Sequence, residues 1–268
     1  MKYLNLGCGS RYHSDWINVD FTSTSDNVIA HNLLEGIPFP DNHFDVVYNS
    51  HVLEHFSKEA GRNFLRECFR VLNTDGIIRI VVPDLEQLAL EYIKSLNSVS
   101  AVSNELNKAN YEWSTIELLD QMVREQPGGS MLQYWEKDQI VNEEQIVNRV
   151  GHEYLKIRDH IVKSKNIKTS NVSIKRSLKT KLKFFLLKKL NVNIDNLQVG
   201  NFRNGGEIHK WMYDKYSLTQ LLTELGFKNI TIQKANSSKI VDWEKYNSLD
   251  LEGEFIRKPD SLFIEAVK

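Results

Sequence analysis

Short apolar runs separated by polar turns fill the first third of the chain. Runs of this length, bounded by Gly, Pro, Asn or Asp, predict buried strands. They lie at residues 3–6, 16–20, 28–30, 44–48 and 77–82. Apolar residues also recur at helical spacing from Glu59 to Leu72, and Pro83-Asp84 ends the fifth strand and caps a helix from Leu85 to about Leu96. This alternation predicts an α/β fold with a parallel sheet.

The alternation stops after residue 96 and resumes near residue 207. Helix-like stretches cover 104–125 and 137–163, with a turn at 127–129 between them. A helix at 217–225 and strands at 229–233 and 261–267 follow, and we expect these two strands to pair antiparallel at one sheet edge. We therefore expect a Rossmann-like first part (1–96), a helical insertion on the substrate side between strands five and six (97–206), and completion of the sheet (207–268).

The turn after the first strand has the features of a ligand site. Gly7 and Gly9 flank Cys8, which allows a tight turn and a close approach of backbone N–H groups to a ligand. Asp20 ends the second strand, where a nucleotide-binding α/β unit places its ribose-binding acid. The connection to that strand is too short for a crossover helix and allows only a helical turn at 11–15. Tyr12 stands where the third glycine of a dinucleotide fingerprint would fall, which argues against NAD.

Composition argues against a nucleic-acid-binding protein, a disulfide-stabilised protein and a membrane-spanning protein. The net charge of −1 argues against a generic nucleic-acid binder, and Cys8 and Cys68 cannot form a disulfide framework. The sequence shows neither a signal peptide nor a long apolar run, so we expect a cytoplasmic protein.

A basic stretch at 163–190 stands out against the acidic balance of the rest of the chain, whose net charge without it is −11. Residues 163–189 carry ten basic residues and no acidic one, among apolar residues at helical spacing. One interpretation is a helix packed on the domain with a solvated lysine face. The other is peripheral contact with the anionic inner face of a membrane, where a lipid-linked glycan would be found. We expect no nucleic acid as a partner.

Five motifs, taken in order, resemble those of the class I S-adenosylmethionine-dependent methyltransferases. They are residues 4–9, Asp20, residues 37–45, residues 50–55 and residues 70–76. The short first crossover, with residues 209–214 and 258–262, resembles the small methyltransferases of bacterial surface-polysaccharide gene clusters. The resemblance implies a Rossmann-like, mostly parallel seven-stranded sheet whose last strand is antiparallel, with S-adenosylmethionine as the cofactor.

The resemblance also implies roles for individual residues. The backbone of the glycine turn is then expected to lie against the methionyl part of the cofactor, and Asp20 to bind the ribose hydroxyls. Asn32 and Leu33 would lie at the adenine, and the residues that end strand four would lie near the transferred methyl group. The cofactor residues are then Gly7, Cys8, Gly9, Asp20, Asn32, Leu33, Asn49 and Ser50. Asn32 suits equally well a turn that bonds its own backbone.

Transfer to a hydroxyl requires a base that removes the hydroxyl proton. The candidates are His51 at the end of strand four and His209 after the insertion, with Asp84 beyond strand five as an orienting or assisting group. We expect the acceptor to be a hydroxyl of a sugar or surface glycan, free or lipid-linked. Methylation of an amine on an amino sugar or small metabolite stays open, as does a partner subunit that binds the cofactor without turnover.

Residues 51–55 also fit the H-x-x-E-H pattern of a helical zinc peptidase. That site needs a helix of several turns and a third protein ligand. Because the segment directly follows a predicted buried strand, we expect no metal here, with Glu54 and His55 anchoring the loop through local hydrogen bonds.

Overall fold

The computed structural model describes residues 1–23, 25–167 and 193–268. Its main feature is a seven-stranded sheet with the order β3-β2-β1-β4-β5-β9-β6. The strands are β1 (Tyr3–Leu6), β2 (Ile17–Asp20), β3 (Val28–Ala30), β4 (Phe44–Ser50), β5 (Leu72–Pro83), β6 (Lys228–Gln233) and β9 (Ser261–Val267). Strand β9 runs antiparallel to both β5 and β6, while the pairs from β3 to β5 are parallel. The expected Rossmann-like sheet and the antiparallel pairing of the last two strands are confirmed.

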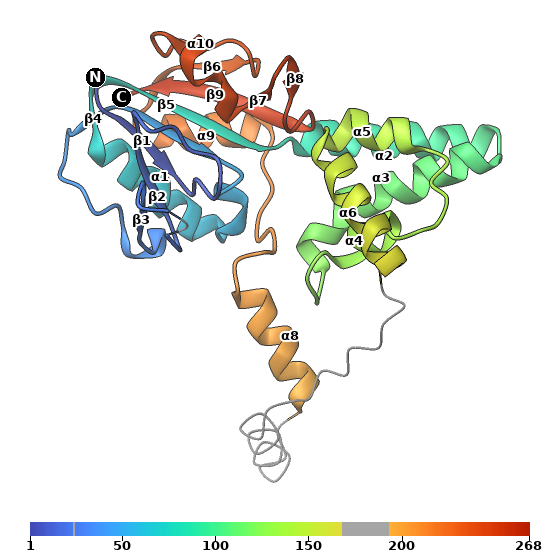
Figure 1. Cartoon of the computed structure of the whole chain (residues 1–268). Helices are drawn as coiled ribbons and strands as arrows, with labels where there is room; N and C mark the ends of the chain where they lie inside the picture. The colour runs from blue at the N-terminus through green and yellow to red at the C-terminus, as the bar shows by residue number, and fades with distance from the viewer. Residues whose placement is uncertain (24, 168–192) are drawn as a thin grey trace.

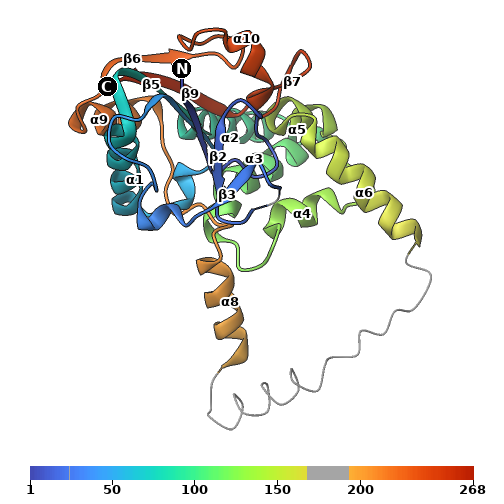
Figure 2. The ribbon, with the colours of Figure 1, turned by 60° about the vertical axis from the view of Figure 1, so that its left-hand side comes forward.

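Different elements cover the two faces of the sheet. Helices α1 (Lys58–Val71) and α9 (Lys215–Glu224) bury apolar side chains against one face. The other face packs against α10 (Trp243–Tyr246) and the segment around it, with Trp16 and Tyr48 in the same cluster. Figures 1 and 2 show α1 and α9 on the side of the sheet away from α10. The short elements are η1 (Leu33–Glu35), η2 (Leu53–His55), η3 (Asn247–Leu249) and the hairpin of β7 (Leu251–Glu252) and β8 (Phe255–Ile256).

The helical insertion lies beyond the end of the sheet to which β5 points (Figure 1). Its described helices are α2 (Leu85–Ala101), α3 (Glu105–Val123), α4 (Gly129–Trp135), α5 (Glu143–Val150), α6 (Glu153–Ile167) and α8 (Ile194–Asn204). It has an apolar cluster of its own around the buried Trp113. Within the described ranges, no helix combines the length and the apolarity needed to cross a membrane. Most of the basic stretch predicted at 163–190 lies outside the described residues.

One local prediction needs correction and two become more detailed. The boundary expected at residue 96 falls inside α2, which continues to Ala101 and packs on α3. The helix-like stretch expected over 137–163 contains two helices, because Gly151 ends α5 with a φ of 83°. Residues 11–15 form no helix, but the N–H of Trp16 bonds to the carbonyl of His13 in a single hydrogen-bonded turn.

A buried arginine holds the α10 side of the sheet together. Arg79 of β5 is 0% exposed and ion-pairs with Asp250 at 2.8 Å and with Glu265 of β9 at 2.7 Å. Its guanidinium also lies 4.4 Å from the ring centre of Trp243. Burial raises the pKa of Asp250, and the charge of Arg79 opposes this effect. The Arg79 cation therefore connects the neighbouring strands β5 and β9 to the segment after α10 that contains Asp250.

We expect Arg79→Ala to leave two buried carboxylates without their cation. Removing one partner of a buried ion pair costs about 3–5 kcal/mol. The free energy of unfolding in urea measures this loss. The control Arg66→Ala removes an exposed arginine and is expected to change that free energy by less than about 0.5 kcal/mol. Equal effects of the two substitutions would contradict the assignment.

Candidate active site

The turn after β1 places backbone N–H groups at the carboxyl ends of the first strands. Gly7 has a φ of 66°, and a Cβ on it would lie 2.3 Å from Cγ2 of Val52. The N–H of Gly7 donates to the carbonyl of Val19 at 2.8 Å, and that of Gly9 donates to Oδ2 of Asp20 at 2.7 Å. Glycine is required at position 7 by both its conformation and its space.

Two cavities meet at this turn. The wide cavity, about 460 Å³, is lined on the sheet side by Asp20 and Asn32 and on the insertion side by residues 204–206 and Lys210. The narrow cavity, about 210 Å³, is lined by the backbone turn together with Arg11, Ser50 and Arg257. Gly7 and His51 line both cavities. A ligand lying over Gly7 could therefore reach into the two cavities at once.

Most of the predicted cofactor residues line these cavities. Gly7, Cys8, Gly9 and Ser50 line the narrow one, and Gly7, Asp20, Asn32 and Leu33 line the wide one. Burial raises the pKa of the Cys8 thiol to about 11, so Cys8 lines the narrow cavity as an uncharged thiol and not as a thiolate nucleophile.

Two predicted asparagines differ in what surrounds them. Asn32 caps η1 through its side-chain oxygen and donates to Glu35 at 3.0 Å, so its amide is already engaged locally. Asn49 is fully buried outside both linings, and its amide has no hydrogen-bond partner among the described residues. Contacts of either residue with a cofactor stay predictions.

His51 stands where the cavities join. Its φ of 55° is unusual for a residue with a Cβ, and its N–H donates to the carbonyl of Val81 at 2.8 Å. Nε2 lies 2.9 Å from the hydroxyl of Ser261, and Nδ1 lies 3.2 Å from Oε1 of Glu54. The contact with Glu54 is a close charge contact rather than a well-aligned hydrogen bond. The arrangement resembles a base held by an orienting carboxylate.

Glu54 connects β4 to the chain that returns from the insertion. Its carbonyl accepts the N–H groups of Lys210 at 2.7 Å and Trp211 at 3.2 Å, and Nδ1 of His55 lies 3.1 Å from the carbonyl of Ile208. The local hydrogen bonds expected of Glu54 and His55 are not what anchors this loop, because these contacts reach residues 208–211 and use the Glu54 backbone rather than its side chain. η2 is a turn of three residues, so the helix of a zinc peptidase does not form here.

The Glu54 carboxylate is 0% exposed and ionised. Burial opposes ionisation, but His51, followed by His209 and His55, holds the pKa of Glu54 at about 2. Neither carboxylate oxygen has a hydrogen-bond partner among the described residues. This buried negative charge has three histidines near it, and burial together with this charge raises the pKa of Tyr213 to about 12.

His209 and Asp84 lie away from both cavity linings. His209 is 4% exposed, and burial lowers the pKa of its ring to about 3, which makes it a weak base. Asp84 caps α2 through Oδ1, which accepts the N–H of Glu86 at 3.1 Å, and burial raises the pKa of its carboxyl. Neither residue lines either of these two cavities, and their catalytic roles stay predictions that this placement disfavours.

Three lining residues escaped the sequence analysis. Phe21, 72% exposed, follows Asp20 at the wide cavity, and Arg11 and Arg257 line the narrow one. Nη2 of Arg257 donates to the hydroxyl of Ser50 at 3.2 Å. The position of Phe21 directly after the acid of strand two was a usable signal, whereas nothing near Arg257 in the sequence indicates its proximity to Ser50.

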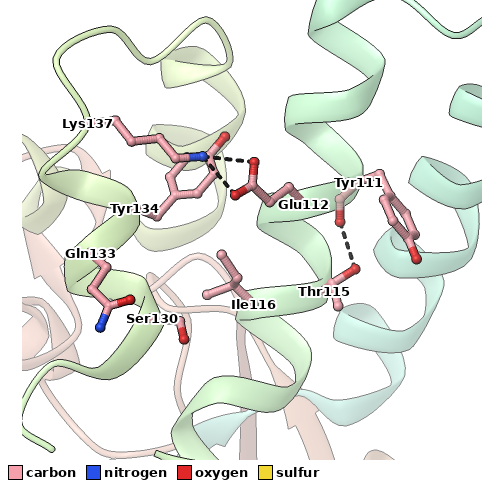
Figure 3. A pocket seen from close by; sticks show the side chains of 8 residues that line it. All are labelled: Tyr111, Glu112, Thr115, Ile116, Ser130, Gln133, Tyr134 and Lys137. Carbon is pink, nitrogen blue, oxygen red and sulfur yellow. Dashed lines mark hydrogen bonds and ion pairs between the residues drawn. The ribbon is translucent and has the colours of Figure 1, made fainter.

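A separate hollow of about 460 Å³ lies inside the insertion. It is lined by residues of α3 and of the α4 region, including Tyr111 and Tyr134. Figure 3 shows Lys137 reaching across to Glu112, whose two oxygens it contacts at 2.8 Å each. None of the predicted site residues lines this hollow.

Comparison with known proteins identifies the part of the chain that holds the site. Residues 4–80 match the family model described as a methyltransferase domain. The match runs from β1 into β5, and so includes the glycine turn, Asp20 and His51.

Curated relatives agree over a similar share of the chain. A probable S-adenosylmethionine-dependent methyltransferase of Mycobacterium tuberculosis is 34% identical over 99 residues, which cover 30% of this chain and 35% of that protein. One of Mycolicibacterium smegmatis is 34% identical over 98 residues, covering 30% and 37%. The match thus spans about a third of the length of these relatives.

Solved structures of methyltransferases are similar only distantly. A SAM-dependent methyltransferase of Archaeoglobus fulgidus has a TM-score of 0.39 at 14% identity, covering 100% of this chain and 86% of that one. One of Mesorhizobium loti has a TM-score of 0.38 at 10% identity, covering 100% and 90%. Likenesses of this size carry no weight for function.

We expect Gly7→Ala to disrupt the turn more than Gly9→Ala. Both residues have positive φ, but only the added Cβ at position 7 meets Val52, while at position 9 it meets nothing within 4 Å. Overpacking costs about 1–3 kcal/mol, so Gly7→Ala should lower the free energy of unfolding by at least about 1 kcal/mol more than Gly9→Ala. Urea unfolding of both variants measures the difference, and equal losses would refute it.

Proposed function

We propose that this chain is an S-adenosylmethionine-dependent methyltransferase that acts on a hydroxyl of a sugar or glycan. One observation carries the proposal: the two cavities join at Gly7 and His51, inside the segment that matches a methyltransferase domain. The bound cofactor supplies an electrophilic methyl group on a sulfonium. The protein aligns the acceptor and takes its proton.

The lining residues suit the chemistry of this cofactor. Asp20 keeps acceptor capacity for a ribose diol beside its bond to Gly9, and Phe21 and Leu33 offer apolar surface for a purine. The methionyl part would follow the glycine turn into the narrow cavity. Arg11 and Arg257 supply cations there for its carboxylate. A side chain at position 7 would fill the point where the two halves meet.

His51 is our choice of base. Its Nε2 already lies 2.9 Å from an aliphatic hydroxyl, that of Ser261, and an acceptor hydroxyl can take a similar position. The Glu54 carboxylate beside Nδ1 orients the ring and stabilises the imidazolium that forms when the proton arrives. His209 lacks this access because it is buried outside the linings.

The acceptor class rests on the resemblance to enzymes of surface-polysaccharide clusters. Residues 204–206 and Lys210, where the chain returns from the insertion, border the wide cavity and would meet the acceptor. The basic stretch 163–190 belongs to the proposal through its charge, which suits an anionic membrane carrying a lipid-linked glycan. N-methylation of an amino sugar needs no base once the amine is neutral. Because Nε2 of His51 lies within hydrogen-bond distance of the hydroxyl of Ser261, it can also accept a proton from an acceptor hydroxyl, which favours O-methylation.

We expect Asp20→Asn to weaken S-adenosylmethionine binding. The amide keeps an oxygen for the N–H of Gly9 but loses the charge that strengthens hydrogen bonds to ribose hydroxyls, a loss of roughly 1.5–3 kcal/mol or at least about tenfold in affinity. Titration calorimetry with the cofactor measures it. Asp26→Asn, an exposed aspartate outside both linings, should bind as the parent does. No cofactor binding by the parent protein would refute the proposed function.

We expect His51→Ala to lower kcat about 10²–10⁴-fold while cofactor affinity changes little, because general base catalysis contributes about that factor. Transfer of labelled methyl to bacterial cell-envelope extracts measures kcat. His160→Ala, which removes an exposed imidazole of α6, is the control. Normal turnover by His51→Ala would exclude His51 as the base. Label on amines would favour N-methylation, and cofactor binding without any transfer would favour a partner subunit.

A further inference from the structure

We propose that Glu54, His55 and His209 form a binding site for a zinc-type divalent cation. One ligand atom from each residue lies within 4.8 Å of the other two. Two imidazoles and one carboxylate are a ligand set that zinc takes up in proteins, with a fourth position left open. The site differs from the peptidase pattern of residues 51–55, because His209 replaces His51 as a ligand and no long helix is needed. It departs from our expectation, made from the sequence, that residues 51–55 hold no metal.

The first support is the charge of Glu54. A carboxylate that is 0% exposed needs compensation, since an isolated buried charge is very costly. Nδ1 of His51 lies 3.2 Å from Oε1, and neither carboxylate oxygen has a hydrogen-bond partner among the described residues. A cation on Oε2 would leave the contact between Oε1 and His51 in place.

The second support comes from the two imidazoles. Nδ1 of His55 is committed to the carbonyl of Ile208 at 3.1 Å, which leaves Nε2 as the free nitrogen and matches the usual outer hydrogen bond of a metal-bound histidine. Nδ1 of His209 is buried and has no hydrogen-bond partner among the described residues. Each of the two rings therefore has a nitrogen available to a metal ion.

The ring geometry is compatible with a shared ion. Two imidazoles on one tetrahedral zinc, with bonds of about 2.1 Å, place their ring centres about 5 Å apart, while the ring planes stay free to rotate about those bonds. The rings of His55 and His209 have centres 5.0 Å apart and planes at 82°. Ligand atoms around such an ion lie about 3.3 Å apart, so the three side chains must close inward by rotation.

The position of the site gives the cation a function. His55 lines the wide cavity, and Glu54 contacts His51, so the ion would lie between the proposed base and the acceptor space. Its open position could take the acceptor oxygen and favour the ionised form of a hydroxyl. It would also fasten residues 208–211 to η2. This use rests on the proposed function, whereas zinc binding itself does not.

The test is zinc binding by the full chain after dialysis against a chelator. Calorimetric titration with ZnCl₂ should give one ion per chain, and zinc should raise the thermal unfolding temperature. Cobalt(II) in place of zinc should give the intense visible absorption of a four-coordinate ion. Glu54→Gln, which keeps the shape of the side chain, and His209→Ala should each weaken zinc binding at least 100-fold. His160→Ala, which removes an exposed imidazole, should bind zinc as the parent does.

Several results would overturn the site. These are a parent protein that binds no zinc, or Glu54→Gln and His209→Ala variants that bind it as tightly as the parent. If either variant fails to fold, the cobalt spectrum of the parent still decides, because weak six-coordinate absorption would indicate surface binding. Cofactor binding measured on the same samples separates the outcomes: zinc binding without cofactor binding refutes the proposed function alone, and the reverse refutes the metal site alone.

Discussion

The buried carboxylate of Glu54 is the constraint on which the site depends. A charge removed from water must be compensated by neighbours that the fold supplies, and here they come from both sides of the insertion. His51 and His55 come from the end of β4, and His209 comes from the return segment. The backbone of Glu54 accepts two N–H groups from that same segment. The chain can therefore close the site only when residues 208–211 are docked on η2.

A second buried charge organises the opposite face in the same way. Arg79 pairs with acids from β9 and from the segment after α10, so this cation joins elements distant in sequence. The two clusters differ in completeness. Arg79 contacts two carboxylates, three carbonyl oxygens and the rings of Trp243 and Phe263, whereas the carboxylate oxygens of Glu54 have no hydrogen-bond partner among the described residues. A saturated cluster serves stability alone, while an undersaturated one beside a cavity retains capacity for a ligand.

Sequence reasoning succeeded where local rules govern the backbone. The seven strands, the glycine turn and Asp20 at the end of β2 follow from short-range patterns, and the structure has them as expected. It failed where a contact joins distant segments. The contact between His55 and Ile208 spans 153 residues and that between Arg257 and Ser50 spans 207, and no periodicity encodes either. Helix ends also failed, since the extension of α2 to Ala101 is set by packing on α3 rather than by a stop signal.

The distinction between local patterns and distant contacts also describes how the proposed chemistry is distributed along the chain. In the proposal, residues 4–80 supply most of the donor side, with Arg257 added from beyond the insertion. Residues 204–206 and Lys210, at the end of the insertion and just after it, line the opposite side of the wide cavity, where we propose that the acceptor binds. His51, which has a positive φ directly after β4, lines both cavities. In the proposed enzyme, acceptor choice would therefore change through the residues that return from the insertion, provided that the docking of residues 208–211 on Glu54 is kept.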